Sequence, residues 1–403
     1  MFRNQIYLLL LLSIAYFAAR RHKRWKANTL QFSLSSEKNL IRLAADLKDR
    51  AYLIKPSLCF IAFKPVKREI FAGDFRDRVI HHFIFNSLNP YYDRLFISDC
   101  YSCRQKRGTD YGIKRAAFFL RSASENYHRE AYVLKLDISG YFMNIDRRLL
   151  YRKNKFLIKQ FFKNKPDELN LLLYLLKLVI FNDPTKNCRQ RGRREDWRGL
   201  PKNKSLFYAA PGKGLPIGNL TSQLFGNVYL NDFDHFVKEK LRVKYYGRYV
   251  DDMIFIDVDK EYLKSLIPKI NDYLKTNLGL GLHPKKIYLQ PCRHGLKFLG
   301  AVIKPRRIYV GSRLKGNFYQ KIKAAGRGQE KNPAFFNSYL GLMKKRQSFN
   351  LRRKIMTAPE TKIALKQLKL RVADDYRRVF YDSRENSQPR LERLNEQIKK
   401  QNL

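Results

Sequence analysis

Hydrophobic residues follow two different periods along the chain, and together they predict an α+β protein. Apolar runs at 131–138 and 244–256 are rich in β-branched and aromatic residues, and shorter runs at 60–63 and 67–72 flank Lys64 and Pro65. Runs of this length bounded by turn residues indicate strands, and the last two indicate a hairpin. Longer stretches with helical spacing are most of 29–56, two segments within 151–183, 220–236, 262–278 and the basic region from Arg313 onward.

Two adjacent aspartates interrupt the apolar run at 244–256. We expect two strands joined by a tight turn centred on Asp251 and Asp252, because Asp tolerates turn geometry. Asp137 ends the run at 131–136 and is a third candidate, whereas Asp146 suits the N-cap of a helix. Buried like charges need a counter-ion, and three carboxylates suit two Mg²⁺ ions that clamp the reacting oxygens of a phosphoryl transfer. The alternative is a solvated Asp-Asp turn, which the apolar flanks argue against.

The net charge indicates which class of partner the chain binds. The 403 residues are enough for two or three subdomains, and 82 Lys and Arg against 35 Asp and Glu give a formal net charge of +47. Nucleic acid is the natural counter-ion of such a chain, and a membrane surface is the competing one. The five cysteines do not form a complete zinc motif, fit a reducing cytoplasm and are expected to be packing residues.

Three segments in order along the chain resemble the palm motifs of reverse transcriptases. They are Lys135-Leu136-Asp137-Ile138, Gly214-Leu215-Pro216-Ile217-Gly218-Asn219-Leu220-Thr221-Ser222-Gln223 and Tyr249-Val250-Asp251-Asp252. The second segment more narrowly resembles the reverse transcriptases of diversity-generating retroelements. Other reverse transcriptases mostly have Gln in place of Ile217 and Pro in place of Gln223.

This resemblance implies a right-hand polymerase fold with fingers, palm and thumb. It also implies an RNA-directed DNA polymerase that uses dNTPs and two Mg²⁺ ions, with Mn²⁺ as a substitute. The expected product is adenine-mutagenised cDNA copied from a template-repeat RNA, with a small basic partner, the accessory variability determinant protein. Two alternatives stay open: another bacterial reverse transcriptase, of the group II intron-like or phage-defence kind, or a catalytically idle RNA-binding protein.

The resemblance also assigns residue roles at the active site. Asp137, Asp251 and Asp252 are the catalytic carboxylates and, with Ile138, the metal site. Arg68, with Lys67 as second candidate, grips the triphosphate, and a guanidinium suits this because it forks onto phosphate oxygens. Phe142 is the aromatic gate against a 2′-hydroxyl. The remaining assignments are the proton donor Lys286, with Lys285 as runner-up, the nucleotide contacts Ile217, Gly218 and Gln223, and the primer grip Phe298, Leu299 and Gly300.

Plainer roles compete with several of these assignments. Lys67 could be a solvated basic residue in a turn, Phe142 a core aromatic and Lys286 a structural cation. Ile217 offers no side-chain hydrogen bond where relatives have Gln, so we expect weaker discrimination against mispairs. Gly218 allows the backbone to approach the nascent base pair closely.

The N-terminal apolar run at 7–19 has the length of a signal-peptide core and is short for a membrane span. The bases Arg20-Arg21-His22-Lys23-Arg24 follow it, which is unusual for a cleavage site, and the run resembles the family's N-terminal helix. We expect a helix that packs on the fingers or on a partner, a basic RNA-contacting turn, no stable membrane association and a cytoplasmic location.

The expected division of the chain completes the prediction. It comprises an N-terminal helical and basic extension at 1–50, fingers at 51–130, a palm at 131–310 with a fingers insertion at about 151–213, a thumb at 311–382 and a polar tail at 383–403. Asp374 and Asp375 form a second Asp pair, which is expected in a charged helix without catalytic function.

Overall fold

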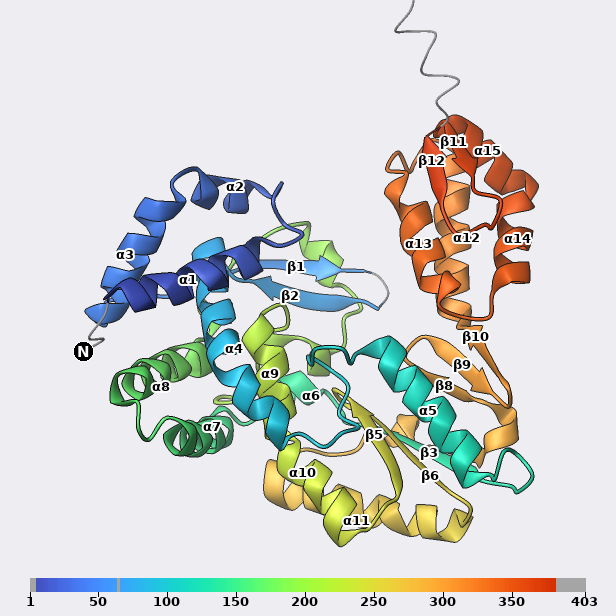
Figure 1. Cartoon of the computed structure of the whole chain (residues 1–403), viewed down its shortest axis with the longest axis horizontal. Helices are drawn as coiled ribbons and strands as arrows, with labels where there is room; N and C mark the ends of the chain where they lie inside the picture. Colours follow the sequence, from blue (N-terminus) through green and yellow to red (C-terminus); the bar gives the residue numbers. More distant parts are fainter. Residues whose placement is uncertain (1–4, 64–65, 382–403) are drawn as a thin grey trace, which may run out of the picture. The chain divides into compact units, whose positions relative to one another are not determined.

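The computed structural model describes residues 5–63 and 66–381, and the chain forms two compact units, Met1–Pro291 and Cys292–Leu403 (Figure 1). The predicted α+β class is confirmed by helices combined with antiparallel sheets. The predicted polar tail and the hairpin turn at 64–65 lie outside the described residues. The other predicted domain limits stay predictions.

A four-stranded antiparallel sheet forms the centre of the first unit, in the order β5-β6-β3-β7. Met253–Ile256 are all buried, which means that both faces of the sheet are covered. Helices α5 (Thr109–Ala123) and α11 (Lys260–Leu278) supply this cover. The strands are β3 (Tyr132–Asp137), β5 (Tyr245–Tyr249), β6 (Asp252–Asp257) and β7 (Tyr288–Pro291).

The predicted hairpin around residues 64–65 forms as β1 (Leu58–Ala62) and β2 (Arg68–Ala72). A short strand, β4 (Arg189–Gln190), adds to β1 in parallel. The expected helix within 29–56 is divided into α2 (Ala27–Leu34) and α3 (Ser36–Lys48), because Ser35 leaves the helical region with φ −131° and ψ 45°.

The N-terminal run forms α1 (Gln5–Arg20), which packs across α4 (Phe75–Leu95) (Figure 1). One face of α1, including Leu8, Leu12 and Tyr16, is buried. The described residues contain no helix that is both long and apolar enough to span a bilayer.

Most of the further helices of this unit pack on one another and on α4. Asp146 caps α7 by accepting a hydrogen bond from Leu149 N at 2.8 Å, as predicted. The segment after Gly218 forms a helix from Leu220 that continues through α10 (Asn231–His235) into a π-helical turn at Phe236–Lys240. The other helices are α6 (Tyr141–Asn144), α7 (Arg147–Phe161), α8 (Pro166–Phe181) and α9 (Leu220–Tyr229).

The second unit has its own core, centred on Phe318, Phe336 and Leu340. A three-stranded antiparallel sheet, β8 (Leu296–Phe298), β9 (Ala301–Lys304) and β10 (Arg307–Val310), precedes four helices. These helices are α12 (Ser312–Gly326), α13 (Ala334–Lys344), α14 (Phe349–Thr357) and α15 (Pro359–Gln367).

The expected helix around the second Asp pair was wrong. Asp374 and Asp375 lie in the turn between β11 (Leu370–Val372) and β12 (Val379–Tyr381). Asp375 satisfies the turn locally, since its side chain accepts a hydrogen bond from Arg377 N at 3.0 Å. Local Asx bonding of this kind favours a turn over a helix interior.

Candidate active site

The turn between β5 and β6 contains two residues, Val250 and Asp251, because Tyr249 pairs directly with Asp252. The turn is therefore centred one residue earlier than the expected Asp251-Asp252 pair, and its left-handed position is Val250, with φ +57°. A β-branched residue in this region is a genuine conformational outlier that its surroundings must hold in place. Ser102 Oγ accepts from Val250 N at 3.3 Å, and the Arg248 guanidinium donates to Val250 O at 2.9 Å.

Arg248 anchors this turn from inside the protein, and the sequence did not reveal it. Its side chain and that of Asp234 on α10 are both fully buried, and Nε and Nη2 donate to the Asp234 carboxylate at 2.7 and 2.5 Å. Tyr246 Oη donates to the same carboxylate at 2.7 Å. Burial alone would lower the pKa of Arg248, but Asp234 outweighs it and raises this pKa well above its usual value. The signal available in the sequence was a charged residue, Arg248, within an otherwise apolar strand.

The three predicted carboxylates gather at one end of the sheet. Asp137 at the end of β3 lies opposite Asp252 at the start of β6, and Asp251 is the residue before it. The pKa of Asp251 is raised to about 6, first by burial and then by the charges of Asp137 and Asp252. Like charges held this close favour a bound cation.

Among the described residues, two lysine ammonium groups contact these carboxylates. Lys286 Nζ donates to both Asp137 oxygens at 2.9 Å, and Lys135 Nζ lies 3.0 Å from Asp252 Oδ1. Lys286 reaches Asp137 because the turn at Pro284–Lys286 is tied to β3, with His283 N donating to Asp137 O at 2.8 Å. Lys285 is exposed. Lys135 was missed, although its place two residues before Asp137 puts both side chains on one face of the strand.

The chemistry of the three carboxylates suits divalent cations. Asp137, Asp251 and Asp252 offer the hard oxygen donors that Mg²⁺ prefers, and the two lysines show that positive charge is accepted there. Within residues 5–63 and 66–381, no three His, Cys, Asp or Glu side chains lie in positions that could hold one metal ion. The donor types fit Mg²⁺, and the carboxylates would have to exchange their lysine contacts to close around an ion. Ile138 is buried and bridges to Leu282, so its carbonyl is the group it can offer.

The predicted nucleotide contacts lie on three neighbouring segments. Phe142 is on α6, and Phe142 O accepts from Leu215 N at 2.8 Å. Ile217 O accepts from Phe71 N on β2 at 2.7 Å. Gly218 has φ +128°, and a Cβ added there would lie 2.7 Å from Phe71 O, so this position requires glycine. Thus the loop at 214–219 is held between the palm and the fingers hairpin.

Other predicted residues lie at the edges of this arrangement. Arg68 begins β2 and is exposed, whereas Lys67 Nζ donates to Arg198 O at 2.6 Å. Gln223 is an exposed residue of α9. Phe298, Leu299 and Gly300 lie in the second unit, at the end of β8 and in the turn before β9. Their role as a primer grip stays a prediction.

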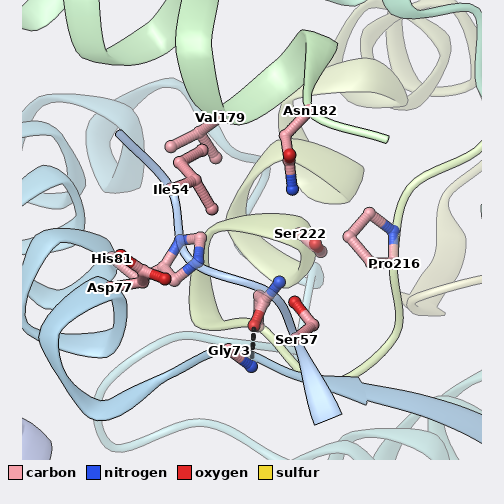
Figure 2. A pocket seen from close by; sticks show the side chains of 10 residues that line it. Ile54, Ser57, Gly73, Asp77, His81, Val179, Asn182, Pro216 and Ser222 are labelled. Carbon is pink, nitrogen blue, oxygen red and sulfur yellow. Dashed lines mark hydrogen bonds between the residues drawn. The ribbon is translucent and has the colours of Figure 1, made fainter. Parts of the chain in front are cut away.

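A buried polar layer behind the loop joins it to α4, around a small cavity (Figure 2). His81 Nδ1 lies 2.8 Å from Thr221 Oγ1, and Gly73 N donates to Asn219 Oδ1 at 3.4 Å. Burial lowers the pKa of His81 to about 4 and raises that of Asp77 to about 6. His81 therefore serves as a neutral hydrogen-bonding residue.

An antiparallel sheet with carboxylates grouped at one end and a fingers hairpin beside it defines a right-hand nucleic-acid polymerase. Family comparison gives the particular class: the family described as Reverse transcriptase (RNA-dependent DNA polymerase) matches residues 67–303, which is more than half of the chain. The chain belongs to this family. The predicted polymerase fold and the resemblance to reverse transcriptases are confirmed at that level.

Individual relatives are distant. Protein YkfC of Escherichia coli (strain K12) is 22% identical over 279 residues, which are 61% of this chain and 66% of that protein. The apo telomerase of Candida tropicalis, truncated from its C-terminal domain, has TM-score 0.43 and 14% identity over 68% of this chain and 60% of its own. The Candida albicans telomerase bound to a telomeric RNA fragment has TM-score 0.42 and 11% identity over 78% of this chain and 55% of its own. The chain thus spans only part of each of these proteins.

Proposed function

We propose that this protein is an RNA-directed DNA polymerase that extends a primer on an RNA template with dNTPs. The observation that carries the proposal is the grouping of Asp137, Asp251 and Asp252 at one end of the palm sheet, next to a family-typical fingers hairpin. The net charge of +47 supports a nucleic-acid partner, and its binding should weaken steeply with salt.

Two Mg²⁺ ions would be held by Asp137, Asp251, Asp252 and the Ile138 carbonyl, and Mn²⁺ could replace them. When bound, such ions supply Lewis-acid stabilisation of the attacking and leaving oxygens. The chain's own contribution is preorganisation, since the Arg248–Asp234 pair fixes the turn that presents Asp251.

Side chains around the carboxylates complete the proposed chemistry. Lys286, which contacts Asp137 in this structure, would hold a proton near the leaving pyrophosphate, with Nζ as the donor atom. The Phe142 ring would stack under the sugar and exclude a 2′-hydroxyl. The Arg68 guanidinium would bind the triphosphate, and its exposure at the start of β2 leaves it accessible.

The narrower proposal is a polymerase of a diversity-generating retroelement that copies a template-repeat RNA into adenine-mutagenised cDNA. Its support is the segment Ile217-Gly218-Asn219-Leu220-Thr221-Ser222-Gln223, in which the apolar Ile217 occupies the position where most other reverse transcriptases have Gln. Mutagenic retrohoming would require the accessory variability determinant protein as a partner.

Primer extension on a defined RNA template tests the activity. Wild type should incorporate dNTPs in Mg²⁺ and largely reject rNTPs, and Asp251→Asn should lose activity by at least about 10³-fold. Asp257→Asn is the matched control, because Asp257 lies at the opposite end of the same strand. RNA binding without incorporation by wild type would instead favour an idle RNA-binding protein.

The template assignment needs a separate readout. Sequencing the extended products should show misincorporation concentrated opposite template adenines. An even error spectrum would favour another bacterial reverse transcriptase and would leave the polymerase activity itself in place.

A further inference from the structure

Residues 183–213, called the insert here, are built onto the fingers hairpin. Arg189 N donates to Ser57 O and Arg191 N to Cys59 O, both at 2.8 Å, so the insert extends the β1–β2 sheet through β4. The rest of the insert forms short 3₁₀ turns, which are η1 (Pro184–Lys186), η2 (Arg194–Trp197), η3 (Lys202–Lys204) and η4 (Leu206–Tyr208).

Glu69 connects the insert to the fingers. It lies in β2 next to Arg68, is only 1% exposed, and its carboxylate accepts from Ser205 Oγ at 2.7 and 3.0 Å and from Leu206 N at 3.1 Å. Burial raises the pKa of Glu69, although the hydrogen bonds from the insert oppose the shift. A buried carboxylate is costly unless it is hydrogen-bonded, so Glu69 and Ser205 depend on each other.

The insert also contributes to the apolar cluster against which two predicted nucleotide contacts pack. Leu206 joins Phe71 and Met143 in a small buried cluster, and Phe142 and Ile217 pack against that cluster. The two side chains expected to read the sugar and the base pair therefore rest on the same apolar support. That support includes a residue of the insert.

Close backbone contacts reinforce this arrangement on both sides. A Cβ added at Gly140, next to α6, would lie 2.7 Å from Asn203 O, so the insert approaches the start of the Phe142 segment without a gap. On the fingers side, Lys67 donates to Arg198 O. Movement of the insert would therefore displace the Phe142 segment and the start of β2 together.

We propose that the insert is the rear wall of the nucleotide pocket and that Glu69 is the positioning residue that fixes it. Together they set the discrimination exerted by Phe142 and Ile217. The inference rests on the proposed polymerase function and deepens it, because it locates nucleotide specificity in a residue that faces away from Arg68. In β2, Glu69 and Phe71 form the buried face, and Arg68 lies on the other.

The test compares variants of Glu69 in steady-state primer extension. Glu69→Ala should raise KM for dNTP about 5- to 50-fold with kcat changed about twofold at most, because Ser205 and Leu206 N lose their partner. The preference for dNTP over rNTP should fall about tenfold as Phe142 loses its support. Glu69→Gln should retain most of the wild-type values, since its amide can accept from Leu206 N and donate to Ser205 Oγ.

A matched control separates positioning from general stability. Asn154 is fully buried and accepts from Tyr92 Oη at 2.9 Å, between α7 and α4. Asn154→Ala removes a comparable buried hydrogen bond and should lower the melting temperature without changing KM or the dNTP preference. If Glu69→Ala does not fold, Ser205→Ala provides a milder form of the same loss and should change both quantities in the same direction.

Proteolysis gives a readout independent of catalysis. Trypsin should cleave within the insert several-fold faster in Glu69→Ala than in wild type or Asn154→Ala. Unchanged KM and dNTP preference in folded Glu69→Ala and Ser205→Ala would overturn the inference and leave the polymerase function standing. Wild type that extends no primer would overturn the proposed function, and the inference with it.

Discussion

The buried Arg248–Asp234 pair makes the sharpest prediction, because it supports both the fold and the strained turn before Asp251. Arg248→Met keeps an unbranched side chain of similar length and removes the charge. It leaves the fully buried Asp234 carboxylate without its cation, and the Val250 carbonyl loses a donor at 2.9 Å. Breaking a buried ion pair in this way costs about 3–5 kcal/mol.

Urea denaturation followed by tryptophan fluorescence measures this cost. The two tryptophans, Trp25 and Trp197, both belong to the first unit, so the signal reports on the unit that contains Arg248. With an m-value of about 2 kcal/mol/M, the midpoint should fall by about 1.5–2.5 M. Lys264→Met, which breaks an exposed pair with Glu261, is the control and should change the free energy of unfolding by less than about 1 kcal/mol.

A double variant isolates the cause. In Arg248→Met with Asp234→Asn no charge stays buried alone, and at least about half of the lost stability should return. The pair does not hold the turn if the free energy of unfolding of Arg248→Met lies within about 1 kcal/mol of the wild-type value. The same conclusion follows if adding Asp234→Asn restores no stability.

The remaining predictions concern the metal site, the polar layer and the loop. Lys135→Met should tighten Mn²⁺ binding in isothermal titration calorimetry about 2- to 5-fold, because Mn²⁺ no longer competes with the Lys135 ammonium group for Asp252. Weaker binding would contradict this. The folded-state pKa of His81 is about 4, so its stabilising effect is complete above pH 6.5 and is lost as the pH falls toward 4. Between pH 7.5 and 5, wild type should lose about 2 kcal/mol more stability than His81→Gln in urea titrations, and parallel pH profiles would refute the assignment. Ile217→Gln should reduce misincorporation in sequenced extension products, and an unchanged error rate would count against a role in fidelity.

The sequence predicted the elements whose pattern is local. The apolar runs around Asp137 and Asp251 became the central strands, and the Asp146 cap formed as expected. The hydrophobic pattern failed where hydrogen bonds from side chains to the backbone decided the conformation. Val250 adopts a left-handed conformation against its own preference because Ser102 and Arg248 hold it. Asp374 and Asp375 form a hairpin turn because short-range Asx bonding competes with the helix.

Long-range partners were beyond the reach of sequence patterns. Glu69 and Ser205 are 136 residues apart, and Lys286 and Asp137 are 149 apart. Family resemblance pointed to Lys286, but only the structure shows its contact with Asp137. Neither periodicity nor resemblance pointed to Glu69, whose neighbour Arg68 carries the family's signal.

The proposed polymerase activity requires Asp137, Asp251 and Asp252 to act together at one metal-dependent site. Single-turnover primer extension on an RNA template in Mg²⁺ tests this directly with Asp137→Asn, Asp251→Asn and the double variant. Each single substitution should reduce the rate by at least about 10³-fold, and the double variant should be little worse than either, as expected for residues that act as a unit. Wild-type rates in Asp137→Asn, or effects of the two substitutions that multiply, would contradict a shared site.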